Sequence, residues 1–264
     1  KLKGVIPLAI DLINEKYVVS HPGITYGGLI HKGEIKGELT FSIFSKLKSY
    51  LKRNGFKSLI YKPVPFIFNK KVYCDDIYYL LRFKAKIVGF DLSSSINLRE
   101  SINKSKRRER SLKKAKKNNL RIEKGVEFLD LFWEILNSNL VNKYRVKPVH
   151  DLSEIKYLIN LFPDNIECYV CLKNDEVLAG VILFKTAKVV HTQYIGSSLL
   201  GKSICALDFL FDYLINKSLE TDFDWFNFGV STESNGSKLN VNLYNYKSEY
   251  GAGSTLYYTY KLDL

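Results

Sequence analysis

The stretch that decides the fold runs from Val189 to Gly253. It reads as a strand, VVHTQYIG at 189–196, a turn, LLGKS at 199–203, a helix over 204–216 and a second strand, WFNFGV at 225–230. A strand that opens through a glycine-containing turn into a helix presents main-chain N–H groups and the positive end of the helix dipole. Because that arrangement suits an anionic phosphate, the stretch predicts an α/β fold with a ligand site at the strand–helix junction.

The composition is that of a packed globular protein. The chain has 264 residues, of which 46% are apolar and 25% charged, enough for one large domain or two small ones. No apolar run approaches the roughly 20 residues that cross a bilayer, and no signal peptide is visible. We therefore expect a cytoplasmic protein, or one held peripherally at the inner face of the membrane.

Cysteine and histidine show no pattern for a metal. Four cysteines in a chain of this length indicate a reducing compartment. Cys168 and Cys171 are three apart in an expected strand, so they would point to opposite faces and are poorly placed to share one ion. The four histidines, at 21, 31, 150 and 191, have no metal-ligand spacing. We expect no metal site.

The net charge of +13 is unevenly distributed. Between Arg99 and Arg121 the chain holds eleven Lys/Arg residues and two acids, so this segment supplies most of the excess. Residues 103–118 predict a basic helix with Leu112 and Ala115 as its packed side and basic residues, Arg108 among them, over the remaining surface. A charge run is usually a solvated face. This density favours an anionic partner for 104–117: a nucleotide diphosphate, a lipid-linked phosphate, the membrane surface or tRNA. Because no aromatic residues are interleaved, we expect no sequence-specific nucleic-acid binding.

The first hundred residues predict a partial α/β unit. Strands are expected at 4–12 and 16–20, an amphipathic helix at 34–53, a strand at 58–64, a helix at 75–82 and a strand or strand pair at 85–98. The chain starts at Lys1, already inside a strand pattern, and contains no methionine. We expect that N-terminal residues of the natural protein are absent.

The same kind of unit begins again after the basic helix. Helices are expected at 126–143 and 153–161, strands at 166–172, 177–186 and 189–197, then the helix and strand quoted above, a short helix from Lys238 and a strand at 255–262. Residues 18–22 and the helix after them occupy the place of 189–216. We predict two related mixed-sheet units, 1–100 and 120–264, joined by the basic connecting helix 101–119.

Several motifs together resemble the FemAB-like branch of the GNAT acyltransferases, which are often found in bacterial surface-polysaccharide loci. They are HPGITYGG at 21–28, PVH at 148–150, HTQYI at 191–195, FGVSTESNG at 228–236 and YK at 246–247. The resemblance implies tandem GNAT-like acyltransferase domains, the first incomplete at its N-terminus, a donor bound as a thioester or as a charged tRNA, and an amine acceptor. The chain departs from this pattern at Tyr250, where relatives tend to carry phenylalanine before the glycine.

The resemblance also implies a donor site. GNAT enzymes splay the strand before the phosphate loop so that its main-chain N–H groups bond the thioester carbonyl and the pantetheine. The corresponding residues here would be Gln193, Tyr194, Ile195, Gly196, Gly201, Lys202 and Ser203. Taken alone, a loop with one glycine favours an ordinary strand–helix turn, and only the surrounding order of elements reverses this preference. Acetyl-CoA or another acyl-CoA is the expected co-substrate.

Three residues are candidates for the chemistry. Period-two alternation places His191, Gln193 and Ile195 on one strand face and Thr192 and Tyr194 on the other. His191 has the natural pKa of a base that accepts a proton from an amine, or it is a core histidine. Glu233 lies in a polar loop after a strand, as catalytic or as capping groups do. Lys247 would stabilise the oxyanion that forms on attack, or it is a solvated helix lysine.

The acceptor contacts are expected at His21, Tyr26, Gly27, His150 and Asn240. Glycines in such loops also simply make turns. The reading we prefer is an N-acyltransferase, most simply an N-acetyltransferase, that acylates the amine of a nucleotide- or lipid-linked amino sugar for surface polysaccharide, by direct attack and without an acyl-enzyme. The alternatives are a Fem-type transferase that takes an amino acid from aminoacyl-tRNA to a cell-wall precursor, and a non-catalytic GNAT-like protein that binds an anion or glycan.

Overall fold

A computed structural model describes residues 2–22, 25–144 and 146–264. Gly23 and Ile24, inside the loop expected to bind acceptor, and Lys1 lie outside the described residues. Contacts divide the chain into two compact units. Unit one comprises Lys1–Ser93, Val230–Asn240 and Ser254–Leu264, and unit two comprises Ser94–Gly229 and Val241–Gly253. In this division the basic helix belongs to unit two, and two C-terminal segments belong to unit one.

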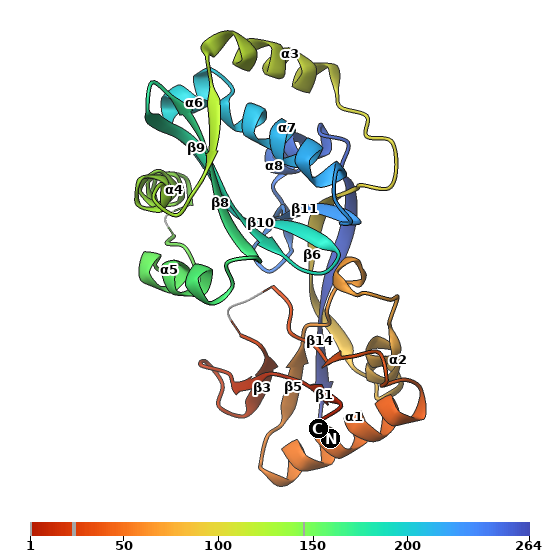
Figure 1. The fold of residues 1–264 in the computed structure, drawn as a ribbon. Helices are drawn as coiled ribbons and strands as arrows, with labels where there is room; N and C mark the ends of the chain where they lie inside the picture. The colour runs from red at the N-terminus through yellow and green to blue at the C-terminus, as the bar shows by residue number, and fades with distance from the viewer. Residues whose placement is uncertain (1, 23–24, 145) are drawn as a thin grey trace. The chain divides into compact units, whose positions relative to one another are not determined.

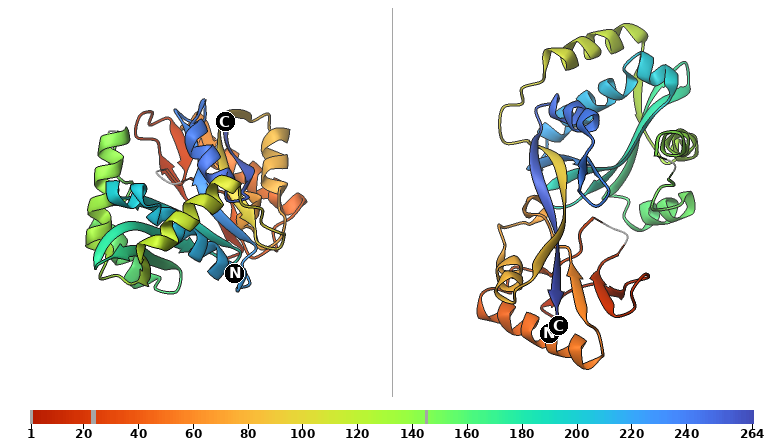
Figure 2. Two further views of the ribbon diagram at one scale, coloured as in Figure 1. Left: turned by 90° about the horizontal axis from the view of Figure 1, so that it is seen from above. Right: turned by 180° about the vertical axis from the view of Figure 1, so that it is seen from behind.

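Unit two is a mixed sheet with helices on both faces (Figures 1 and 2). Its strand order is β11 (Trp225–Val230), β10 (Val189–Ser197), β9 (Glu176–Lys185), β8 (Ile166–Lys173) and β7 (Arg121–Lys124). The β10–β11 pair is parallel and the others are antiparallel. Helices α4 (Leu129–Tyr144) and α5 (Leu152–Leu161) pack on one face, α7 (Ala206–Leu219) packs on the other, and α3 (Lys106–Ala115) contacts α7.

Two apolar clusters, one on each face, hold unit two together. The central strands β8 and β9 are almost continuously buried, as strands covered on both faces must be. Cys168 packs in the cluster under α4 and α5, whereas Cys171 packs in the cluster under α7, so the two thiols do lie on opposite faces. Gly180 is required on β9 because a Cβ there would overlap the ring of Phe132. Close contact between α4 and the sheet depends on that glycine.

Unit one contains the strand order β2 (Leu8–Ile10), β3 (Tyr17–Ser20), β5 (Ser58–Tyr61) and β14 (Gly253–Asp263). Helices α1 (Glu38–Arg53) and α2 (Asp75–Arg82) contact each other, and residues of α1, α2 and the sheet share a core with Phe44, Leu59 and Tyr61. Its smaller elements are β1 (Gly4–Val5), β4 (Ile30–His31), a 3₁₀ turn at Phe66–Phe68, and the hairpin of β12 (Thr232–Glu233) and β13 (Lys238–Leu239). Strand β6 (Lys86–Asn97) runs from unit one into unit two.

The two units share one topology. In unit one, β2 pairs antiparallel with β3, and β3 leads through α1 to its parallel neighbour β5. In unit two, β9 pairs antiparallel with β10, and β10 leads through α7 to its parallel neighbour β11. This equivalence is the one expected between residues 18–22 and 189–216. The fold is a mixed α/β fold built from two related units.

Three elements differ from the sequence-based expectation. The turn expected at 199–203 is the short helix α6 (Leu199–Ser203), and the helix expected over 204–216 is α7, which begins at Ala206 because Cys205 before it is left-handed with φ 63°. The predicted start of a helix at Lys238 is wrong, because Lys238 lies in β13 and α8 runs from Val241 to Ser248. The basic helix begins only at Lys106, because the Ser105 side chain caps it by accepting from Arg108 N–H. Within the described residues, no helix is long and apolar enough to cross a bilayer.

Candidate functional site

The parallel ladder between β10 and β11 opens partway along its length. It joins Val189–His191 to Trp225–Asn227, although β10 continues to Ser197 and β11 to Val230. Gly229 has φ 72°, a left-handed conformation that turns β11 away and that only glycine adopts without cost. On its other edge β10 has a bulge between Thr192 and Tyr194, which leaves Gln193 as the extra residue. The opened ladder corresponds to the splayed strand that the resemblance predicted for a donor site, whereas the bulge was not predicted.

The bulge changes which side chains share a face, and the expected alternation along β10 is wrong for this reason. His191 pairs opposite Phe184 and Tyr194 pairs opposite Ile182, two residues that pack on the α4–α5 side. Ile195 instead packs in the cluster under α7. One inserted residue therefore brings His191 and Tyr194 to the same face.

Asn227 determines the protonation of His191. Its Oδ1 accepts the main-chain N–H of Gly229 at 3.0 Å, and its Nδ2 donates to Ser95 Oγ at 2.7 Å. The amide orientation is therefore defined, and Oδ1 is the atom that lies 2.6 Å from His191 Nδ1. Because a carbonyl oxygen can only accept, Nδ1 carries the proton and Nε2 the lone pair of a base.

Burial keeps His191 neutral. It is the main cause that lowers the pKa of His191 below its usual 6.5, and the charge of Lys247 lowers it further, against the opposing effect of hydrogen bonds to Asn227 and Gln193. A Cβ at position 229 would lie 3.3 Å from His191 Cε1, so the imidazole packs directly on Gly229. The glycine that opens the ladder also makes room for the imidazole.

Lys247 is buried, with only 2% of its surface exposed, and is not the solvated helix lysine of the alternative interpretation. It lies on α8, and its Nζ donates to Gly229 O at 2.9 Å. Burial lowers the pKa of Lys247 from 10.5 to about 7. A lysine with this pKa changes its charge near neutral pH. Lys247 does so while bonded to the carbonyl of Gly229, the residue that packs against His191.

Three further predicted residues, Gln193, Tyr194 and His150, join this cluster through hydrogen bonds. Gln193 bonds to the side chains of both His191 and Tyr194. The Tyr194 hydroxyl accepts the His150 main-chain N–H at 3.2 Å and lies 2.7 Å from His150 Nδ1. The Tyr194 ring itself packs edge-on against Trp133 in the core. Residues expected to bind donor and residues expected to bind acceptor thus form one polar chain from His150 to Asn227.

The expected phosphate loop is a short, well-bonded helical turn. Ser198 caps α6 by accepting from Gly201 N–H at 3.0 Å, and Ser203 Oγ donates to Leu200 O at 2.8 Å. Gly201 is glycine because a Cβ would overlap the carbonyl of Leu178, and Gly196 packs against Phe132 of α4. Lys202 is exposed. These glycines have packing roles, and donor binding by this loop stays a prediction.

The remaining candidates lie in unit one. Asn240 Nδ2 donates to Glu233 Oε1 at 2.8 Å, so the proposed catalytic acid and the proposed acceptor contact are partners on the β12–β13 hairpin. His21 and Gly27 also meet, because a Cβ on Gly27 would overlap His21. Tyr26 packs against Phe68 with ring centroids 4.6 Å apart, and burial raises its pKa. The roles of these residues stay predictions.

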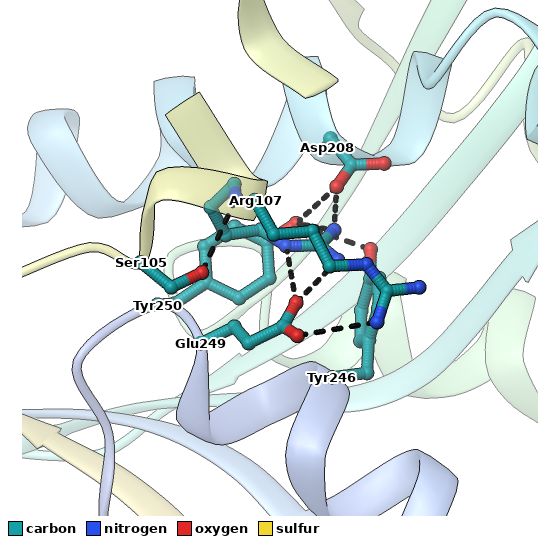
Figure 3. A network of polar contacts seen from close by, with 7 residues as sticks. Ser105, Arg107, Asp208, Tyr246, Glu249 and Tyr250 are labelled. Carbon is teal, nitrogen blue, oxygen red and sulfur yellow. Dashed lines mark hydrogen bonds and ion pairs between the residues drawn. The ribbon is translucent and has the colours of Figure 1, made fainter. Parts of the chain in front are cut away.

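The surface position expected for Arg108 is wrong. Its side chain lies among Asp208, Tyr246, Glu249 and Tyr250, which Figure 3 shows together with Ser105 and Arg107. Arg108 is 3% exposed and pairs with Asp208 and with Glu249, the latter at 2.7 Å. Its guanidinium lies 4.4 Å from the centroid of the Tyr246 ring. Two carboxylates and a ring face compensate its burial, whereas Leu112 and Ala115 are buried as expected.

Asn227 is the residue that sequence reasoning missed. A polar side chain at the centre of the apolar strand WFNFGV was the available signal, since a buried amide requires partners. No group of three or more His, Cys, Asp or Glu side chains in the described part of the chain is placed to hold a metal ion.

Solved structures share this fold at low sequence identity. The crystal structure of FemX matches with TM-score 0.68 and 12% identity over 100% of this chain and 85% of that chain. The C-terminal domain of a putative lysylphosphatidylglycerol synthetase from Agrobacterium fabrum matches with TM-score 0.67 and 12% identity over 98% of this chain and 81% of that chain. A tandem GNAT protein from the clavulanic acid biosynthesis pathway matches with TM-score 0.51 and 9% identity over 99% of this chain and 79% of that chain.

No protein-family model matches the chain, and no curated protein matches its sequence. At 9–12% identity the structural matches establish the fold alone. The chain shares its fold with a tandem GNAT protein, as the sequence motifs predicted.

The tautomer of His191 gives a direct test of this site. Replacing Asn227 by Asp puts a carboxylate beside Nδ1, and an opposite charge at hydrogen-bond distance raises a pKa by roughly one to three units. We expect the pKa of His191 to be higher in the Asn227→Asp protein than in the wild type, where burial lowers it, in NMR titrations of the imidazole nitrogens. The exposed Asn242→Asp exchange adds the same charge on α8 and should leave the His191 titration unchanged. Equal His191 pKa values in the wild type and Asn227→Asp would contradict the assigned geometry.

Proposed function

We propose that the chain is an acyltransferase that moves an acyl group from an activated donor to an amine, at the opening between β10 and β11. The observation that carries the proposal is the interrupted ladder, with a base and a buried lysine at the point where it opens. In a regular sheet these strands would bond each other throughout. An opening offers main-chain N–H groups to a carbonyl or amide of a bound donor.

The residues at the opening account for each proton and bond. The amine nitrogen attacks the donor carbonyl, the new N–C bond forms, and the bond from carbonyl carbon to the leaving sulfur or oxygen breaks. His191 Nε2 accepts the proton that the amine loses and passes it to the leaving sulfur or oxygen. Lys247, as a cation, stabilises the oxyanion that develops on the carbonyl oxygen. The polar chain from His150 through Tyr194 and Gln193 orients His191.

For the donor and acceptor we retain the sequence-based proposal. The donor is acetyl-CoA or another acyl-CoA, held by 193–196 and by the turn with Gly201, Lys202 and Ser203. The acceptor is the amine of a nucleotide- or lipid-linked amino sugar in surface-polysaccharide biosynthesis. The transfer is direct, without an acyl-enzyme, and the protein is cytoplasmic.

A second candidate has specific support. The TM-scores to FemX and to the lysylphosphatidylglycerol synthetase domain are 0.68 and 0.67, against 0.51 for the tandem GNAT protein. The name of the lysylphosphatidylglycerol synthetase denotes a product in which an amino acid is joined to a phospholipid. Together with the FemAB-like motifs and the exposed basic residues of α3, this supports an aminoacyl group delivered by charged tRNA as the alternative donor.

A thermal-shift screen separates the two donors. A ligand that binds only the native state at 100 times its dissociation constant stabilises it by about 2.7 kcal/mol. We expect a CoA thioester to raise the melting temperature by several degrees, and an S-alkyl-CoA thioether, which lacks the carbonyl, to raise it less. Retention of aminoacyl-tRNA over uncharged tRNA on filters, with no shift from any CoA thioester, would favour the second candidate. If the protein responds neither to CoA thioesters nor to aminoacyl-tRNA, the proposed transfer is contradicted.

A further inference from the structure

The hairpin between β2 and β3 in unit one exposes two large apolar side chains at its tip. Leu12 is 98% and Ile13 is 96% exposed, although turns normally carry polar residues and glycine. Single exposed apolar residues are ordinary on proteins. Two adjacent and almost fully exposed ones at a protruding turn indicate a surface that is covered by something else.

The turn itself holds these side chains outward. Asp11 Oδ1 accepts the main-chain N–H groups of Ile13 and Asn14, both at 2.8 Å. Two main-chain bonds, Asp11 N to Tyr17 O at 3.0 Å and Tyr17 N to Asn14 O at 2.8 Å, close the loop. Leu12 and Ile13 therefore lie on an ordered turn, in which the Asp11 carboxylate bonds to the main chain of the turn itself.

Basic residues lie next to the hairpin. Lys57 N–H donates to Lys16 O at 2.8 Å, so the start of β5 lies beside the hairpin. Lys16, Arg53 and Lys57 are exposed, and so is Tyr50 in the last turns of α1. Unit one as a whole holds eighteen Lys/Arg and nine Asp/Glu residues. This excess of nine positive charges complements an anionic surface, and the Glu15 carboxylate at the tip is outnumbered by its basic neighbours.

We propose that this end of unit one docks on an anionic lipid bilayer. The docking surface consists of Leu12, Ile13, Lys16, Tyr50, Arg53 and Lys57. Leu12 and Ile13 enter the boundary between headgroups and acyl chains, where apolar side chains leave water. The lysines and Arg53 remain at the headgroup phosphates, with their aliphatic stems on the apolar surface and their charges in water. The surface is distinct from the basic helix α3 and does not depend on the proposed transfer reaction.

Vesicle co-sedimentation of the full chain tests the proposal. The probe is vesicles of equal parts phosphatidylglycerol and phosphatidylcholine, compared with phosphatidylcholine alone. We expect the wild type to bind the anionic vesicles and to bind them less at high salt. The Leu12→Ser/Ile13→Ser protein should bind about tenfold or more weakly, since two buried apolar side chains are lost. Val72→Ser, at a residue of unit one that is 86% exposed, is the matched control and should bind as the wild type does.

Insertion is tested separately from binding. In the Leu12→Trp protein we expect the added emission to shift to the blue on anionic vesicles and to be quenched by brominated lipids, while Val72→Trp shows neither effect. Vesicle binding unaffected by the double exchange would overturn the proposal, as would binding lost only in a Lys113→Ser/Lys114→Ser protein of α3. A wild type that binds no vesicles but forms a dimer, which the double exchange dissociates, would assign the tip to a second copy of the chain instead.

Discussion

Replacing Lys247 by Met is expected to lower kcat by about a hundredfold to a thousandfold, the usual loss when one oxyanion donor is removed. Methionine replaces the aliphatic stem of lysine as far as Cε, so packing between α8 and β11 is largely kept. Because the lost interaction forms mainly in the transition state, KM should change far less than kcat. The measurement is steady-state kinetics with the donor that the thermal-shift screen identifies.

The same variant carries a second readout. The pKa of Lys247 is about 7 in the folded protein and 10.5 when unfolded, so the unfolded chain binds more protons between these values. Stability from this group therefore rises as pH increases from 7 to 10.5 and is lost as pH falls through 7. In urea titrations, Lys247→Met should reduce this increase of the free energy of unfolding with pH. Lys217→Met, at an exposed position, should keep both the increase and the wild-type kcat. Unchanged kcat in Lys247→Met would remove the lysine from the chemistry, and an unchanged pH profile would contradict its burial.

Replacing Arg108 by Met is expected to destabilise unit two by about 3–5 kcal/mol, because breaking a buried ion pair leaves an uncompensated charge. The substitution leaves the carboxylates of Asp208 and Glu249 without the guanidinium of Arg108. It also removes the cation that lies over the rings of Tyr246 and Tyr250. The measurement is the urea midpoint and slope, which together give the free energy of unfolding.

Arg107 provides the matched control for Arg108. It is the neighbouring residue and contacts the same Glu249 carboxylate at 3.3 Å, but its side chain is 72% exposed. Arg107→Met should change stability by no more than about 0.5 kcal/mol. The Arg108→Met/Glu249→Gln double exchange should be more stable than Arg108→Met, since it removes one stranded charge. Similar losses in Arg107→Met and Arg108→Met would show that the network in Figure 3 contributes little.

Patterns along the chain were sufficient for most of the fold. Continuous apolar runs identified β8 and β9, and the apolar stripe from residue 34 identified α1 although Gly37, with φ 49°, delays its start to Glu38. The strand–turn–helix–strand order of 189–230 identified the place of the opening. Patterns failed where a single residue departs from its periodic conformation, as at the left-handed Cys205 and at the bulge of β10.

The sequence by itself determined the order of elements, the tandem repeat and the segment that holds the candidate site, because periodicity and turn residues are local properties of the chain. Tertiary structure alone decided that Gln193 is a bulge, that Asn227 orients His191, and that Lys247 and Arg108 are buried. The physical reason is that a polar or charged side chain has no preferred place of its own. Its burial, its partners and its pKa depend on groups that folding brings from distant parts of the chain.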